Sequence, residues 1–302
     1  MARRIVLGLN AVILAVTEDQ PRVLTVTVDG SAALPYGPLD PERHPTLERG
    51  LREWVREQTG LELGYVEQLY TFGDRDREPG SADRQLSIVY LALAREGETT
   101  LESAAWAAVY DFLPWEDWRQ GEPTVLDRAL LPRMRRWMRE KSSATERRQR
   151  GEVAFGIAGA AWDGERVLER YELLYEAGEI SESGAEGSSG LGRPMFLDHR
   201  RMMATALGRI RGKIRYRPLI FELLPERFTL WQLQRVAEAL AGRSLHKQNF
   251  RRLVVSGGLV EGTGRLDANT GGRPAELFRF RPEVVRERRA TGVGLPRLPA
   301  TP

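Results

Sequence analysis

The first part of the chain alternates between apolar runs and short polar turns. Residues 5–16 and 22–29 are dominated by apolar and β-branched side chains, and the turn-like TEDQP lies between them. Runs of this length and composition predict two β-strands. Thr46 is a suitable N-cap for a helix over about 47–59, and Gly60 is a suitable C-terminal stop.

More strand patterns follow this helix. Residues 65–70 and QLSIVYLALA at 85–94 are strand-like, FLPW at 112–115 is another apolar segment, and a last helix is expected near 124–140. Two strands, a helix, further strands and a final helix are typical of an α+β domain rather than of alternating βαβ units.

The middle of the chain has a helical pattern. Apolar residues recur at helical spacing from 142 to about 177, and Gly178 is a plausible stop. The Gly/Ser-rich ISESGAEGSSGLGRP at 180–194 predicts a flexible loop. A basic amphipathic helix beginning at His199 then links the two halves of the protein, so residues 142–215 are predicted to be a helical linker.

The last third predicts two helices followed by a hairpin. Thr229 caps TLWQLQRVAEALAG, Ser244 caps SLHKQNFRRLVVSGG, and the strand-like LVEGTG and ELFRFRP flank the turn-rich RLDANTGGRPA. Helix, turn, helix and hairpin is the order of a winged helix-turn-helix, in which the second helix reads DNA. Residues 216–302 therefore form a predicted DNA-binding domain.

Winding the second helix at about 100° per residue separates two faces. An inner face is expected to pack on the preceding helix and contains His246, Phe250, Leu253 and Val254. The opposite face has guanidinium, ammonium and amide groups, which bind guanine and adenine edges or phosphates. Arginines in the hairpin are expected to meet the DNA backbone or a minor groove. The residues predicted to contact DNA are Ser244, Lys247, Gln248, Asn249, Arg251, Arg252, Arg265 and Arg273.

Charge is distributed unevenly along the chain. The net charge is +3, but residues 200–302 contain 21 Lys and Arg against 8 Asp and Glu. A basic C-terminal third fits a polyanionic partner, although charge alone fits a solvated basic surface equally well. At 302 residues, two domains are expected. The chain has no cysteine and no run of eighteen apolar residues, which favours a cytoplasmic protein without disulfides, thiolate metal sites or membrane spans.

LREWVREQTGLEL at 51–63 is similar to the metal-binding helix of Nudix hydrolases, G-x5-E-x7-R-E-U-x-E-E-x-G-U, where U is aliphatic. Aligned on Gly60, the sequence has Trp54 and Gln58 where the motif has metal-binding glutamates, and it retains Glu57. Hard carboxylate ligands are needed to hold Mg²⁺ against a pyrophosphate. Sliding the frame by one residue places Arg56 at a glutamate position, so neither frame gives a metal cage. No metal site, no catalytic residue and no enzymatic activity are predicted, and a pyrophosphohydrolase is the alternative.

Other residues are candidates for ligand binding. The polar FGDRDRE at 72–78 is either a plain turn or a contact for phosphate and ribose groups, and nearby aromatic rings are able to stack on adenine. The three histidines share no metal-ligand spacing, and GSSGLG lacks the ending of a P-loop. The residues predicted to bind a ligand are Tyr36, Arg52, Arg56, Glu57, Tyr70, Phe72, Asp74 and Arg75.

Several long phrases resemble one family. YVEQLYTFGDRDREP, IVYLALA, GGRPAELFRF and the stretch from YRPLIFELLPERF to RRLVVSGGLVE strongly resemble the Nudix-related transcriptional regulators of NAD metabolism, the NrtR family. The phrases around LREWVREQTGLEL and DHRRMMATALGRIRGKIRYRP look most like the alphaproteobacterial NAD regulator of the NadQ type.

The resemblance covers nearly the whole chain. It implies a Nudix-like α/β/α sandwich over 1–141 that senses a nucleotide, followed by the helical linker and the winged helix. It further implies a homodimeric repressor of NAD biosynthesis or salvage genes on a pseudo-palindromic double-stranded operator. The effector would be NAD, ADP-ribose or ATP, no cofactor would be required, and the sign of the effector's action stays open.

Overall fold

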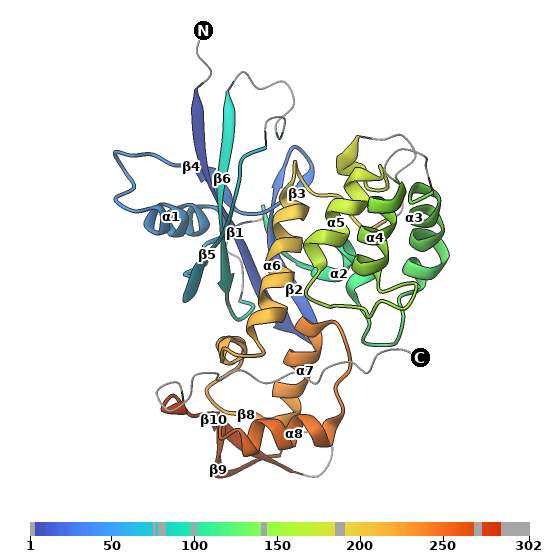
Figure 1. Ribbon diagram of the computed structural model, residues 1–302. Helices are drawn as coiled ribbons and strands as arrows, with labels where there is room; N and C mark the ends of the chain where they lie inside the picture. The colour runs from blue at the N-terminus through green and yellow to red at the C-terminus, as the bar shows by residue number, and fades with distance from the viewer. Residues whose placement is uncertain are drawn as a thin grey trace.

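A computed structural model describes residues 4–74, 77, 83–97, 101, 103–139, 144–184, 191–268 and 274–284. Its N-terminal domain is built on a seven-stranded sheet, seen nearly edge-on in Figure 1. The strands are β1 (Ile5–Thr17), β2 (Gln20–Val28), β3 (Ser31–Ala33), β4 (Tyr36–Pro38), β5 (Tyr65–Phe72), β6 (Arg84–Leu93) and β7 (Ala104–Ala108).

The sheet is mixed, with β1 at its centre. β1 pairs in parallel with β6 and antiparallel with β2 and β4, β5 lies outside β6, and β7 pairs with β2. The strands predicted over 5–16, 22–29, 65–70 and 85–94 are thereby confirmed to within about two residues at most ends. The short β7 has no counterpart in the sequence prediction, because AAWAA lacks β-branched residues.

One face of the sheet is covered by α1 (Leu47–Thr59), and Figure 1 shows this helix alone on its side. Leu51 and Val55, one turn apart, are fully buried against alternate β1 residues such as Ala11. The predicted helix ends are confirmed, because the Thr46 side chain accepts a hydrogen bond from Arg49 N and Gly60 has a φ of 73°.

Helices cover the opposite face. They are α2 (Val109–Phe112), α3 (Leu131–Trp137, preceded by a π-turn at Leu126–Leu130), α4 (Ala144–Phe155), α5 (Val167–Glu176) and α6 (His199–Lys213). The prediction of one continuous helix over 142–177 is wrong, since the helix is interrupted between α4 and α5. Gly156 has a φ of 62°, and a Cβ there would lie 2.6 Å from the backbone nitrogen of Trp162, so the break requires glycine.

α6 packs against the sheet along its length. It buries nine of its fifteen residues, including Met202, Met203 and Leu207, beneath β1 and β5. The segment predicted as a linker therefore belongs to the hydrophobic core that joins the two halves.

Of the loop predicted over 180–194, residues 181–183 form a 3-10 turn and 185–190 lie outside the described residues.

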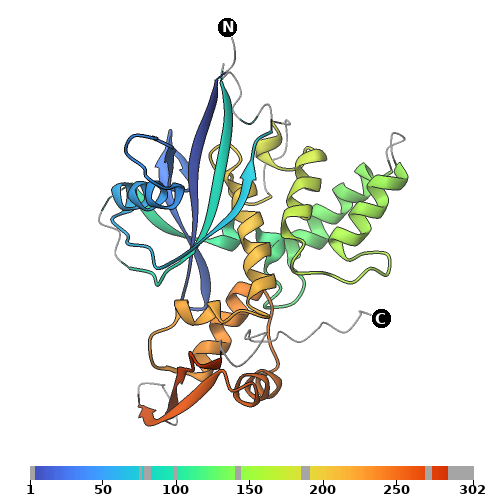
Figure 2. The ribbon, with the colours of Figure 1, turned by 60° about the vertical axis from the view of Figure 1, so that its left-hand side comes forward.

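The C-terminal domain is the predicted winged helix, confirmed by α7 (Leu230–Ala241), α8 (Lys247–Ser256) and the antiparallel hairpin of β9 (Val260–Asp267) and β10 (Ala275–Phe280). Thr229 and Gln232 form a capping box at the start of α7, and Gly242 with a φ of 66° ends this helix. Figure 2 shows the domain below the sheet, with the hairpin projecting downward.

No helix in the described part of the chain is both long enough and apolar enough to cross a bilayer.

Candidate functional site

The second helix of the winged domain exposes most of its surface. Of the ten residues of α8, only Phe250 and Val254 are buried. The predicted reader residues Lys247, Arg251 and Arg252 are exposed, as are Gln248 and Asn249, and none of the three cations has a salt bridge within the described ranges. Uncompensated cations on one exposed helical face are suited to bind the phosphates and base edges of a major groove.

The start of α8 differs from the prediction. The helix begins at Lys247, and its N-cap residue is His246, whose side chain makes no capping hydrogen bond. Ser244, the predicted cap, instead donates its hydroxyl to the backbone carbonyl of Arg119, at 2.5 Å. The capping prediction is wrong because the helix begins three residues after Ser244, which places the serine two residues before the N-cap position.

The inner face of α8 is also narrower than predicted. Phe250 and Val254 are buried as expected, whereas His246 is exposed and Leu253 is 37% exposed. Leu245, in the turn before the helix, is buried in their place. The later start of the helix changes which apolar residue reaches α7.

The wing is described in part. Arg265 is exposed on β9, whereas Arg273 lies outside the described residues. At the base of the hairpin, Arg279 forms a salt bridge with Glu261 at 2.6 Å. Arg265 therefore stays available as a predicted backbone contact, and Arg279 is neutralised by its neighbour.

The Nudix-like helix α1 does not present a metal cage. The side-chain amide of Gln58 bonds to both backbone groups of Tyr36, accepting from its nitrogen at 3.0 Å and donating to its oxygen at 2.6 Å. Trp54 donates its indole N–H to Pro38 O at 2.9 Å and fills the space that a Cβ on Gly37 would need. Both residues fasten β4 to α1, so these positions are used for packing and do not suit Mg²⁺.

The remaining carboxylates of α1 are paired with a cation. Arg43 bonds to Glu53 at 2.6 Å and to Glu57 at 3.2 Å. The guanidinium of Arg52 donates to the backbone oxygens of Leu63 and Gly64, while Arg56 is exposed on the helix. Within the described ranges, no three acidic or histidine side chains cluster closely enough to hold a metal ion.

The second group of ligand candidates lies at the end of β5. Tyr70 is 52% exposed and meets the buried Phe72 edge-on, with 5.1 Å between ring centroids. Phe72 is covered by the guanidinium groups of Arg77 and Arg201, so Tyr70 is the ring that is open to solvent. Arg75 lies outside the described residues.

The segment after β5 is tied to the start of α6 by ion pairs that the sequence did not reveal. Arg77 bonds to both carboxylate oxygens of Asp198, at 2.7 and 2.8 Å, and to Ser87 Oγ at 3.1 Å. In the opposite direction, Arg201 of α6 pairs with Asp74, a predicted ligand residue. These two ion pairs link the end of β5 directly to the start of α6.

A buried polar cluster lies beside Tyr36. His199 Nδ1 accepts the backbone N–H of Leu34 at 3.0 Å, and the side-chain amide of Asn10 lies 3.2 Å from its Nε2. Since Nδ1 is an acceptor, the neutral ring carries its proton on Nε2. The Asn10 atom that faces Nε2 is Nδ2, also a donor, and Oδ1 is buried without a hydrogen-bond partner, so a 180° turn of the amide would let Oδ1 accept the Nε2 proton. The Tyr36 ring lies edge-on to the His199 ring, with 5.2 Å between the ring centroids.

We expect the protein to lose stability in mild acid because of His199. Burial lowers the pKa of this imidazole to about 4, an effect that Asp198 opposes and Arg77 reinforces. In the unfolded chain the ring protonates near pH 6.5, whereas in the folded chain it stays neutral down to about pH 4. The contribution of His199 to the free energy of unfolding is therefore fully present above pH 6.5 and is lost as the pH falls toward 4. Urea unfolding should show a loss of about 2 kcal/mol from this group between pH 7.5 and 5.

The variant His199→Gln should show a weaker pH dependence over this range, and His246→Gln, at an exposed histidine, should behave as the wild type. An unchanged dependence in His199→Gln would mean that other groups cause the loss.

A fully buried ion network joins the two domains. The Glu116 carboxylate accepts hydrogen bonds from Arg170 of α5 at 2.6 and 3.0 Å and from Arg211 of α6 at 2.5 Å. Arg211 also donates to Leu240 O of α7 at 3.1 Å. Burial raises the pKa of Glu116, and the two guanidinium groups more than reverse this and hold the pKa below its ordinary value. The network connects the sheet domain, α5, α6 and the winged helix.

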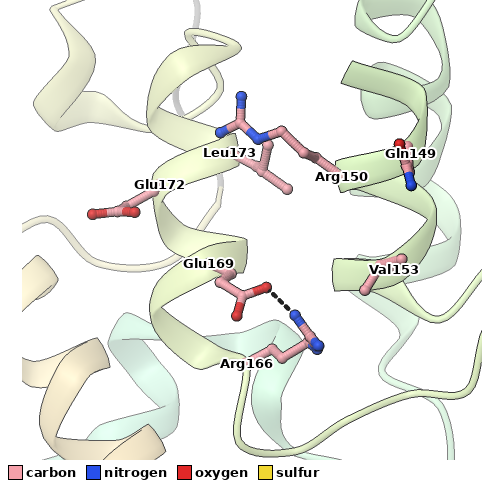
Figure 3. A pocket seen from close by; sticks show the side chains of 7 residues that line it. All are labelled: Gln149, Arg150, Val153, Arg166, Glu169, Glu172 and Leu173. Atoms are coloured by element: carbon pink, nitrogen blue, oxygen red, sulfur yellow. Dashed lines mark hydrogen bonds and ion pairs between the residues drawn. The ribbon is translucent and has the colours of Figure 1, made fainter. Parts of the chain in front are cut away.

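A shallow pocket of about 280 Å³ lies between α4 and α5. Figure 3 shows its mixed lining of charged and apolar side chains, with Arg166 bonded to Glu169 across one end. None of the ligand residues predicted from the sequence lines it. The lining residues are Gln149, Arg150, Val153, Arg166, Glu169, Glu172 and Leu173.

Comparison with known proteins supports this architecture. Residues 220–280 match the NrtR DNA-binding winged helix domain. Over 86 residues, the chain is 40% identical to the ADPR responsive transcriptional repressor NtrR of Acinetobacter baylyi. That match spans 28% of this chain and about a third (34%) of the relative's length.

Two solved structures share the fold over nearly the whole chain. Shewanella oneidensis NrtR in complex with a 27mer DNA has a TM-score of 0.59 and 21% identity, covering 93% of this chain and 95% of the other. A MutT/nudix family protein from Enterococcus faecalis has a TM-score of 0.54 and 14% identity, covering 93% and 88%. The chain is therefore an α+β protein with a Nudix-like N-terminal domain and a C-terminal winged helix.

Proposed function

We propose that this chain, whose C-terminal domain is an NrtR-type winged helix and whose fold is that of NrtR, is a DNA-binding transcriptional repressor of NAD biosynthesis or salvage genes. The observation that carries the proposal is the exposed face of α8, where Lys247, Arg251 and Arg252 have no salt-bridge partner in the described part of the chain. Phosphates and base edges are the complementary partners of such a face.

The effector in this proposal is an adenine nucleotide, with ADP-ribose first and NAD and ATP as alternatives. The response to ADPR named for the Acinetobacter relative supports this order. Asp74 and Tyr70 at the end of β5 are the contacts we infer, because both are exposed and Asp74 pairs with α6. The phrases shared with the NadQ type support placing the chain in that branch, acting in the cytoplasm as a homodimer on a pseudo-palindromic operator.

Pyrophosphohydrolase activity is the alternative class. It finds no support in α1, where Gln58 and Trp54 are bonded to β4 and Arg43 pairs with both Glu53 and Glu57. We expect no Mg²⁺-dependent hydrolysis of ADP-ribose. Turnover that Glu57→Gln abolishes would instead establish the enzyme.

A gel-shift titration on promoters of NAD biosynthesis and salvage genes tests the proposal. Specific binding should appear at nanomolar protein, fall steeply with salt, and change with ADP-ribose, NAD or ATP by at least about fivefold, a typical coupling between two sites. Binding no tighter than to random DNA would refute the repressor function. Binding that is indifferent to all three nucleotides would refute only the effector assignment.

A further inference from the structure

The turn between α7 and α8 is bonded to the N-terminal domain at two successive places. The backbone N–H of Trp118 donates to Gly242 O at 2.6 Å, and the Ser244 hydroxyl donates to Arg119 O at 2.5 Å. Ser244 stands three residues before Lys247, the first residue of α8. The start of the reader helix is therefore attached to a loop of the other domain.

That loop is itself fixed to the sheet. The Arg119 guanidinium donates to Asp19 O and to Gln20 Oε1, the latter at 2.9 Å, and it pairs with Asp117 at 2.7 Å. Glu18 and Asp19 form the tight turn of the β1–β2 hairpin, with φ values of 49° and 63°. Arg119 thus connects the tip of a central hairpin, through its own carbonyl, to Ser244.

The α8 helix buries only Phe250 and Val254. Its direction depends on α7, on β9 after it and on the turn before it, where Leu245 bonds to Glu238 and Gln234 of α7. The turn is also tight, because a Cβ on Gly242 would lie 2.9 Å from the Tyr110 hydroxyl. Base contacts tolerate errors of only about 0.5 Å in the groups that make them, so a small shift at the start of α8 should weaken recognition.

We propose that Ser244 is a positioning residue of the DNA reader rather than a DNA contact. Its hydrogen bond to Arg119 O sets the position of α8 relative to the β1–β2 hairpin. The inference rests on the proposed DNA-binding function and assigns to Ser244 and Arg119 one shared role. Their substitutions must then act on the same interaction.

A double-mutant cycle on operator affinity tests this role. The probe is a duplex selected by the wild-type protein from a random-sequence library. Ser244→Ala should weaken binding about fivefold, the scale of one net hydrogen bond, and Ser244→Thr should restore most of the loss. Arg119→Gln, which releases the loop, should weaken binding by a similar factor. The double variant should be no weaker than the weaker single variant, because both changes break one connection.

The inference would be overturned if the fold loss in affinity of the double variant equalled the product of the two single losses, as independent contacts give. It would also be overturned if Ser244→Ala bound the operator with full affinity. Ser183→Ala is a matched control, because its hydroxyl also bonds to a backbone oxygen, Ile180 O, but lies far from α8; it should leave affinity unchanged. If circular dichroism shows that Arg119→Gln does not fold, Gln20→Ala, which removes one bond to Arg119, replaces it in the cycle. Absence of specific binding by the wild type would refute the proposed function itself, whereas multiplying losses refute the inference alone.

Discussion

Replacing Glu116 with glutamine should lower the free energy of unfolding by about 3–5 kcal/mol, the range for breaking a buried ion pair by removing one partner. The carboxylate is fully buried between Arg170 and Arg211. Without it, two buried guanidinium groups keep their charge and lose their counterion, because arginine does not deprotonate in proteins. Urea unfolding followed by circular dichroism measures the loss.

Glu165 provides the matched control for this substitution. It pairs with Arg215 at 2.6 Å, but both side chains are 41% exposed. Glu165→Gln should change stability by no more than about 0.5 kcal/mol, because solvent screens surface pairs. Equal losses of unfolding free energy in the two variants would contradict the idea that burial of the network determines its contribution to stability.

The double variant Arg251→Ala, Arg252→Ala should lose at least about 100-fold in operator affinity. A bidentate base contact is worth about 1–3 kcal/mol, and each phosphate contact adds an ionic contribution. Both side chains are exposed on α8, so their removal should leave the fold and its thermal midpoint nearly unchanged. The slope of log affinity against log salt should become shallower by about one for each phosphate that the variant no longer binds.

The same pair of substitutions at Arg135 and Arg136 controls for charge. These adjacent arginines are exposed near the end of α3, which Figure 1 places well away from the winged helix. Arg135→Ala, Arg136→Ala removes an equal charge and should leave operator affinity within about twofold. If both double variants lost affinity alike, general electrostatic attraction rather than the α8 face would account for binding.

Local sequence signals predicted those elements whose ends are decided locally. Thr46 and Gly60 bound α1 as expected, and Thr229 and Gly242 bound α7, because capping involves only neighbours along the chain. The start of α8 could not be predicted in this way. Ser244 has the sequence context of a cap, but its hydroxyl bonds to Arg119 O, 125 residues away.

The buried charges escaped prediction for a related reason. Arg170 and Arg211 are buried, and so is Arg200 of α6, whereas Arg201 beside it is partly exposed. No spacing rule in the sequence distinguishes a buried arginine from an exposed one. Glu116, the partner of Arg170 and Arg211, is distant in sequence, in a short turn between apolar residues. Only the packing of α5 and α6 on the sheet brings the three together.

The ligand candidates, too, were only partly predictable from the sequence. Substitutions at Trp54 and Gln58 were visible in the sequence, and the absence of a metal cage was predicted from them. The replacement contacts were not visible, because Gln58 bonds to the backbone of a separate strand at Tyr36. Likewise, FGDRDRE at 72–78 predicted either a plain turn or a ligand contact, and it gave no sign that Asp74 would pair with Arg201 of α6.

The attachment of the α7–α8 turn limits how the two domains of this chain can be recombined with those of other proteins. A chimera that exchanges only the residues after 215 would bring a new turn against the old Trp118 and Arg119, and a new α7 against the old Arg211. A designer who wants a new operator specificity should therefore keep α7 and its turn and exchange only the exposed side chains of α8. Under the proposed function, DNA specificity would then be changed on the exposed face of α8 alone, and the rest of the winged helix would be kept with the N-terminal domain that it contacts.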